Sequence, residues 1–182
     1  SMTIPDRNSH VLKLVRLTEG GFGATIFRGV SLIGGAAAAI ILQSPLRKIE
    51  VIGDSLTCGY GDLGHHPCKW SPDTESALNS WGMLISDYFN AEAHLVSISG
   101  KGLVRNYGDP DPTSAEPMPF FYNRTLASNP DVLWKFEQWI PNAVVINLGT
   151  NDFSTEPFPS QQVFETAYIN LISLIKSHYG SN

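Results

Sequence analysis

The sequence predicts an α/β fold built on a parallel sheet, and two observations predict it. Short apolar stretches at 48–53, 93–99 and 143–148 have the length and composition of buried strands. Segments with helical spacing of apolar residues, at 77–89 and 160–179, alternate with them. Alternating strands and helices indicate a parallel sheet covered by helices on both faces, which is a three-layer αβα arrangement.

The helices are justified by their periodicity and by their ends. Residues 77–89 place Leu78, Trp81, Leu84, Ile85 and Tyr88 at helical intervals. In the segment 160–179, Ser160 is expected to cap the start of the helix and Gly180 to end it. Leu133, Phe136 and Ile140 predict a further short helix over 131–140, with Pro130 just before its start.

The residues before this α/β region have a different rhythm. Residues 10–33 combine an apolar run, a glycine cluster and a stretch of alternation, which predicts two β-strands. Two isolated strands cannot bury a face of their own. We therefore expect residues 1–45 to be the end of an accessory β-sandwich domain with a linker over 34–45, and residues 46–182 to be the α/β domain, incomplete at its C-terminus.

Composition excludes several classes of partner. The 182 residues are 42% hydrophobic and 16% charged, a globular balance, and the net charge is -5. An acidic surface disfavours nucleic acid and anionic membrane as partners. No apolar run reaches the roughly 18 to 20 residues that a membrane-spanning helix needs.

Polar or small residues follow each predicted strand. Gly53-Asp54-Ser55 ends the first, Gly100 follows the second, and Asn151-Asp152 follows the third. The carboxyl ends of parallel strands share one edge, where sites form. Ser55 on a sharp turn suits a nucleophile, and the Ser55 and Gly100 N–H groups with the Asn151 amide suit an oxyanion hole. Taken singly, Ser55 also fits a helix N-cap, and the other two fit ordinary turns.

These blocks, in this order, resemble the GDSL or SGNH hydrolases. The flanking stretches IEVIGDSLTCGYG, CKWSPDTESA, ISGKGLVRNYG, MPFFYNRTL and WIPNAVVINLGTNDFS are similar to carbohydrate esterase family 2, whose members remove acetyl groups from sugars. The resemblance implies Ser55 as nucleophile, Gly100 and Asn151 in the oxyanion hole, and Asp54 and Asp152 as supporting residues, Asp152 holding its loop. It also implies acetylated carbohydrate as substrate, and neither metal nor organic cofactor.

Two cysteines bear on the compartment. Cys58 and Cys68 fall where secreted relatives carry cysteines, so both a disulfide and two free thiols remain open. The sequon Asn123-Arg124-Thr125 is compatible with secretion. We expect a secreted protein.

The family's C-terminal D-x-x-H block has no counterpart in this sequence. The five histidines are His10, His65, His66, His94 and His178, and each has a simpler interpretation in a β segment, loop, strand or helix end. The serine needs a base that takes its proton. We therefore expect either that the chain is a fragment or that a second chain supplies the histidine and completes the sheet.

The sequence contains features of other functions as well as those of a sugar esterase. Trp70, in a loop near the nucleophile, and Tyr107 are candidates to contact a sugar. A metal site at His65, His66 and Cys68 lacks a fourth ligand at a recognisable spacing. The G-x-G-x-x-G match at 59–64 neither follows its strand directly nor opens a helix, which argues against a dinucleotide site. A carbohydrate-binding protein without catalysis and a flavodoxin-like nucleotide-binding domain remain alternatives.

Overall fold

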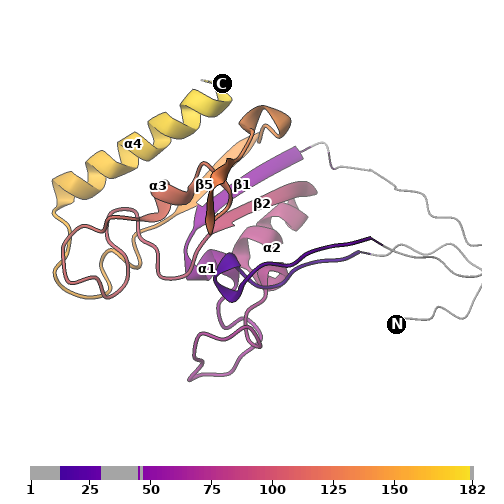
Figure 1. The fold of residues 1–182 in the computed structure, drawn as a ribbon, viewed down its shortest axis with the longest axis horizontal. Coiled ribbons are helices and arrows are strands. Elements are labelled where there is room, and N and C mark those ends of the chain that lie inside the picture. The colour runs from indigo at the N-terminus through magenta and orange to yellow at the C-terminus, as the bar shows by residue number, and fades with distance from the viewer. Residues whose placement is uncertain (1–12, 30–44, 46, 181–182) are drawn as a thin grey trace, which may run out of the picture.

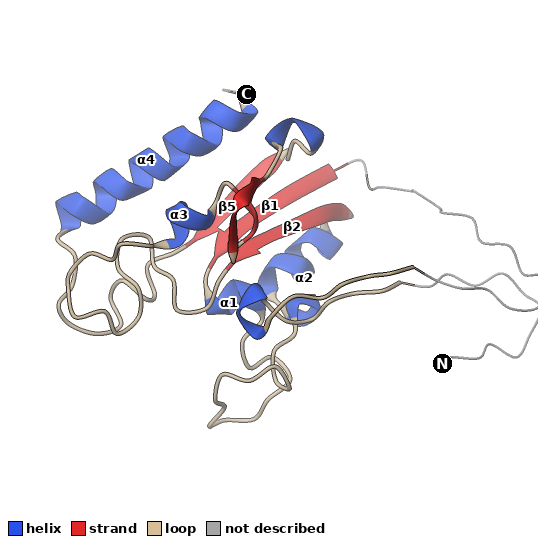
Figure 2. Ribbon diagram, in the orientation of Figure 1, coloured by secondary structure: helices blue, strands red, loops and turns tan. Residues whose placement is uncertain are grey.

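A three-stranded parallel sheet with helices on both faces forms the centre of the molecule (Figure 1, Figure 2). The structure, a computed structural model, describes residues 13–29, 45 and 47–180. The predicted α/β class and parallel sheet are confirmed. Within this part of the chain, none of the helices combines the length and the hydrophobicity that crossing a bilayer requires.

The sheet brings three strand ends to one edge. Its strands are β1 (Arg47–Gly53), β2 (Ala91–Ser97) and β5 (Ala143–Asn147), in the order β2-β1-β5. In the parallel register, Gly53 lies opposite Ser97 on one side and Asn147 on the other. The segments that follow the three strands therefore start level with one another, as the sequence predicts.

Side-chain alternation along β1 divides the core between the two faces. Val51 is fully buried on the face packed by Trp81 of α2 (Trp81–Tyr88). Ile52 is fully buried on the opposite face, with Leu171 of α4 (Gln161–Tyr179). A short helix, α3 (Met118–Phe121), adds Met118 to this second cluster. The helices thus fix β1, and with it the turn at its end.

The predicted ends of α4 are confirmed. The Ser160 hydroxyl accepts a hydrogen bond from the Val163 N–H at 3.3 Å, and Gly180 at φ 86° follows the last helical residue. Ser80 caps α2 in the same way, accepting from the Met83 N–H at 3.5 Å. Each helix start satisfies a backbone donor that has no partner inside the helix.

The helix predicted over 131–140 is wrong. The segment instead forms β4 (Asn129–Leu133), paired antiparallel with β3 (Arg124–Leu126), and then the 3₁₀ turn η3 (Phe136–Gln138). Of the apolar stripe that suggested a helix, only Phe136 is buried, whereas Leu133 is 63% exposed. A short helix needs an apolar face that packs against the fold, and this segment buries too little of its apolar surface. It forms a two-stranded ribbon instead, in which Pro130 is tolerated.

The β-strands predicted within 10–33 do not form in its described part. Residues 13–29 make one 3₁₀ turn, η1 (Gly20–Phe22), and otherwise run without strand pairing. Leu14 and Ile26 are more than 70% exposed, and two isolated arms of this kind cannot bury an apolar face of their own. The linker over 34–45 lies outside the described residues except for Pro45, and the domain division stays a prediction.

The outer edge of β5 has no neighbouring strand in the described part of the chain. Its apolar residues Val144, Val145 and Ile146 are only partly buried, although Val51 and Ile52 in the central strand are inaccessible. An open apolar edge is a site where another strand can pair. That a second chain or further segment completes the sheet stays a prediction.

Candidate active site

Ser55 is the first residue of α1 (Ser55–Cys58), directly after β1, and it is partly exposed. Asp54 caps this short helix, its Oδ1 accepting from the Leu56 N–H at 3.1 Å. Gly53 makes the turn possible, because a Cβ there would lie 2.0 Å from the Thr57 hydroxyl oxygen. The turn presents the Ser55 side chain at the carboxyl edge of the sheet.

Gly100 lies on the loop that follows β2. Its φ of +78° is a left-handed conformation that favours glycine, and its carbonyl accepts from the Tyr107 N–H at 2.9 Å. Within the described residues, the backbone N–H groups of Ser55 and Gly100 donate to no protein acceptor. N–H groups without a protein acceptor are available to hold an oxyanion, which is the role that the sequence predicts for them.

Asn151 ties the three strand ends together. Its Nδ2 donates to the Lys101 carbonyl at 2.8 Å and to Oδ2 of Asp54 at 3.3 Å, and the residue is 5% exposed. The amide therefore links the loop after β5 to the loops after β2 and β1. To serve as the third oxyanion donor, it would exchange one of these two acceptors for the substrate oxygen.

The Asp152 side chain binds the backbone of the loop after β2. Its carboxylate is fully buried and accepts three backbone N–H bonds, from Leu103 at 2.8 Å, Val104 at 2.7 Å and Arg105 at 2.9 Å. Gly102 allows the loop to approach the carboxylate closely, since a Cβ there would lie 2.6 Å from the Asp152 Oδ2. The carboxylate thus supplies the contacts that its predicted loop-holding role needs.

Two buried carboxyl groups, those of Asp54 and Asp152, lie close to the candidate site. Asp54 is fully buried, and burial raises the pKa of its carboxyl above the ordinary value. The Leu56 N–H opposes this rise in pKa, and the nearby charge of Asp152 adds to it. Two buried carboxylates therefore lie close together, each held by backbone donors that compensate for lost water.

Arg105 is a structural residue that sequence reasoning missed. It is fully buried, and its guanidinium donates to the carbonyls of Asp111 at 2.9 Å and Thr155 at 2.7 Å, and to that of Asp109. It also reaches the Glu156 carbonyl at 3.3 Å. The side chain joins the loops that follow β2 and β5. The only sequence signal is its position in the stretch resembling family 2.

None of the described histidines hydrogen-bonds Ser55. The His94 ring stacks on Trp139 at 3.6 Å, and burial lowers its pKa. The His178 ring stacks on Phe136 at 3.7 Å, and its Nε2 lies 3.1 Å from Oδ1 of Asn123. A stacked ring at a helix end or in a strand is a packing residue.

The other two described histidines, His65 and His66, are exposed in the loop after α1, and His10 lies outside the described residues. The positions of His65, His66, His94 and His178 thus agree with their simpler interpretations.

The two aromatic candidates flank the site differently. Tyr107 is 65% exposed next to Gly100, through the backbone hydrogen bond between them. Trp70 is 49% exposed, stacks on Phe22 at 4.3 Å, and donates from Nε1 to Oε1 of Glu19 at 2.9 Å. Both rings retain exposed surface that a sugar could contact.

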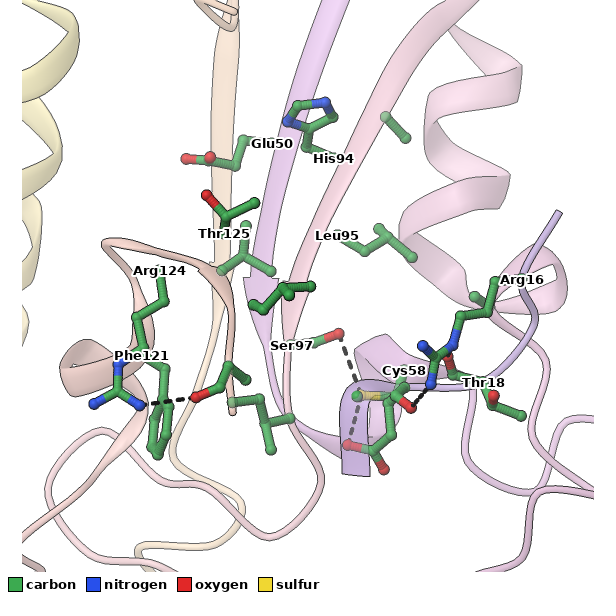
Figure 3. A pocket seen from close by; sticks show the side chains of 18 of the residues that line it. Arg16, Thr18, Glu50, Cys58, His94, Leu95, Ser97, Phe121, Arg124 and Thr125 are labelled. Atoms are coloured by element: carbon green, nitrogen blue, oxygen red, sulfur yellow. Dashed lines mark hydrogen bonds between the residues drawn. The ribbon is translucent and has the colours of Figure 1, made fainter. Parts of the chain in front are cut away.

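The disulfide considered for Cys58 and Cys68 does not form, and both thiols are free. The Cys58 Sγ is buried and lies 3.2 Å from the Ser97 hydroxyl (Figure 3). The Cys68 Sγ instead points to the Lys69 carbonyl at 3.7 Å. The Cys58 sulfur is directed to the end of β2 and the Cys68 sulfur to the loop after α1, so the two do not form a bonded pair.

A cavity of about 610 Å³ in the described part of the chain does not include Ser55, Gly100 or Asn151. It runs along β2 between the hairpin at Arg124 and the N-terminal segment at Arg16 (Figure 3). The candidate site lies instead at the end of the sheet, where the strand ends place it.

Known proteins that are similar to this chain include carbohydrate esterases. The chain is 39% identical over 174 residues to cellulase/esterase CelE of Acetivibrio thermocellus, covering 94% of this chain and 20% of that protein. It is 32% identical over 184 residues to an acetylxylan esterase / glucomannan deacetylase of Cellvibrio japonicus, covering 95% and 49%. The chain thus spans half or less of the length of these relatives.

Solved structures resemble it at the level of the fold. One is a family two carbohydrate esterase from Clostridium thermocellum in complex with cellohexaose, with a TM-score of 0.69 and 40% identity over 79% of this chain and 42% of that one. Another is a carbohydrate esterase family 2 enzyme plus carbohydrate binding domain from Corynascus thermopiles, with a TM-score of 0.70 and 35% identity, covering 78% and 44%. The family described as GDSL-like Lipase/Acylhydrolase matches residues 49–182. The chain therefore belongs to the GDSL-like lipase/acylhydrolase family.

Proposed function

We propose that this protein is a serine esterase that removes O-acetyl groups from carbohydrate through an acyl-enzyme intermediate. The observation that carries the proposal is that the Asn151 amide bonds both Asp54, next to the partly exposed Ser55, and Lys101, next to Gly100, and so links the strand ends that carry these residues. Family membership and relatives named as acetylxylan esterases support the reaction class and the substrate class.

The proposed reaction has two steps. The Ser55 Oγ attacks the acetyl carbonyl carbon and loses its proton to a base, and the Ser55 and Gly100 N–H groups stabilise the oxyanion. The sugar oxygen leaves with a proton, and an acetyl-serine remains. Water then attacks that ester by the same route and releases acetate. The base is a histidine that does not hydrogen-bond Ser55 in the structure, a residue outside the described ones, or a residue of a second chain.

Substrate recognition is assigned to exposed aromatic surface. Trp70 and Tyr107 both have exposed rings, and sugar rings pack on such faces. A structure of a similar esterase contains cellohexaose, which supports a β-linked glucan or a related polysaccharide as the carrier of the acetyl groups. Secretion, expected from the sequence, fits a polymeric substrate outside the cell.

The test is acetate release from an acetylated xylan or glucomannan oligosaccharide, by wild type and by Ser55→Ala. We expect the variant to lose activity by at least roughly a thousandfold, because no other group can form the acyl-enzyme. Release that survives the substitution would exclude Ser55 as the nucleophile. Wild-type release would also show that a base is present, and variants of His65, His66 and His178 would then locate it.

A second candidate function is carbohydrate binding without catalysis. It is favoured by the absence, in the described part of the chain, of a histidine that hydrogen-bonds Ser55. A similar structure, 32% identical with a TM-score of 0.66, is reported with an active site that displays divergent catalytic and non-catalytic binding functions. Calorimetric binding of cellohexaose that is unchanged by Ser55→Ala, without acetate release from any acetylated substrate, would support this candidate.

A further inference from the structure

The segment before the α/β domain reaches the candidate site. The Leu17 carbonyl accepts from the Ala77 N–H at 2.8 Å, which anchors the segment beside α2. The Arg16 guanidinium then braces the turn that follows, donating to the Thr18 carbonyl at 2.8 Å and to the Glu19 carbonyl at 2.7 Å. This bracing holds the Glu19 side chain toward the sheet.

The Glu19 carboxylate joins three separate parts of the site. Its Oε2 accepts from the Ser99 N–H at 2.7 Å and lies 3.6 Å from the Cys58 Sγ. Its Oε1 accepts from Nε1 of Trp70 at 2.9 Å. These partners belong to the loop after β2, to α1 and to the loop after α1. The Glu19 side chain therefore contacts the loop after β2, which carries Gly100, the helix α1, which begins at Ser55, and Trp70, a candidate for sugar binding.

The backbone of the same residue is held as well. The Glu19 N–H donates to Oε1 of Glu75 at 2.5 Å, and Glu75 is 1% exposed. The neighbouring Phe22 ring stacks on Trp70. Glu19 is therefore fixed from both its main chain and its side chain.

We propose that Glu19 is a positioning residue for the esterase reaction, setting the Ser99–Gly100 turn and the Trp70 ring in place. The inference rests on the proposed function. Ser99 immediately precedes Gly100, so a carboxylate that holds the Ser99 N–H also orients the peptide unit that carries the Gly100 N–H. Hydrogen bonds to a charged acceptor are stronger than neutral ones, which suits a contact that must hold a turn rigid.

The expected effect on rate follows from the geometry. A misplacement of about 1 Å at a distance from the chemistry can cost about a hundredfold. Glu19→Ala removes the support but not the Gly100 donor itself, so we expect kcat to fall by about 10- to 100-fold. Glu19→Gln keeps an oxygen that can accept from the Ser99 N–H, and we expect it to recover part of that loss.

The experiment measures kcat, KM and backbone amide exchange at Ser99 by NMR in the full chain. We expect Ser99 exchange to speed up at least about tenfold in Glu19→Ala, as one charge-assisted hydrogen bond is lost. Trp70→Phe removes the indole donor and reduces the aromatic surface but leaves the Glu19 carboxylate in place, so it is expected to raise KM and to leave Ser99 exchange at the wild-type rate. Glu137→Ala, an exposed carboxylate on η3, is the matched control.

The outcomes separate this proposal from the proposed function. A lower kcat with faster Ser99 exchange, partly restored by Glu19→Gln, supports Glu19 as a positioning residue. Unchanged kcat in Glu19→Ala overturns it. If the wild-type chain releases no acetate, the esterase proposal fails by itself, and Ser99 exchange decides: faster exchange supports the positioning contact, and an unchanged rate overturns it.

Discussion

Asp152→Ala tests how the loop after β2 is held. In the structure, the Asp152 carboxylate accepts three N–H groups, those of Leu103, Val104 and Arg105, at 2.7 to 2.9 Å. Leu103 is 1% exposed and Arg105 is fully buried, so water cannot readily replace the carboxylate. Removing it leaves three buried donors without a partner.

The magnitude follows from those three donors. Each buried donor left unsatisfied costs about 1–3 kcal/mol. The loop can relax and admit water to part of the space, so we expect a loss near the lower end of the sum, about 3–5 kcal/mol. Because small domains unfold at a cost of about 5–15 kcal/mol, this is a large fraction of the total. Asp152→Asn keeps one acceptor oxygen but turns an amide N–H toward a backbone donor. Its free energy of unfolding should therefore fall between those of wild type and Asp152→Ala.

Urea denaturation, followed by far-UV circular dichroism, measures the free energy of unfolding for wild type and both variants. Asp73→Ala, at an exposed carboxylate in another loop, is the control and should change the free energy by less than about 0.5 kcal/mol. A loss below about 1 kcal/mol in Asp152→Ala would refute the reasoning, because it would mean that the three N–H groups find other acceptors at no cost.

Three further predictions test other buried groups. Arg105→Lys should lower the free energy of unfolding by about 3 kcal/mol, since an ammonium cannot reach the carbonyls that the guanidinium spans; a loss under about 1 kcal/mol in urea denaturation would contradict this. Burial raises the pKa of Glu75 to about 7 from its ordinary 4.5, so ionisation is harder in the folded state and stability should decrease as pH rises from about 4.5 to about 7. Glu75→Gln should reduce that decrease in thermal unfolding, and an identical pH slope would argue against it. Cys58 is 3% exposed and burial raises the pKa of its thiol, so under native conditions a thiol reagent should modify Cys68 quickly and Cys58 only on unfolding; absence of both free thiols would indicate the disulfide instead.

Local sequence patterns predicted the sheet, because its strands are short apolar stretches and its helices have apolar residues at helical spacing. The stretches at 48–53 and 143–148 are short and mostly apolar, as strands of parallel sheets are, and such stretches are recognisable without knowing their neighbours. The segment 131–140 shows where that reasoning fails. Its spacing of Leu133, Phe136 and Ile140 fits a helix, but in the described structure only Phe136 of these three is buried. The pairing of β3 with β4 depends on a neighbour, which periodicity cannot reveal.

The sequence by itself determined the family, the strand ends and the residues offered there, because Ser55, Gly100, Asn151 and Asp152 lie next to recognisable strands. Only the tertiary structure decided what those residues contact. It showed the Asn151 amide engaged by the Lys101 carbonyl. It also brought Glu19, 80 residues away in sequence, to the Ser99 N–H, and buried a guanidinium between two loops. Contacts of this kind join segments distant in the chain, and they arise from the packing of the sheet edge rather than from any local pattern of residues.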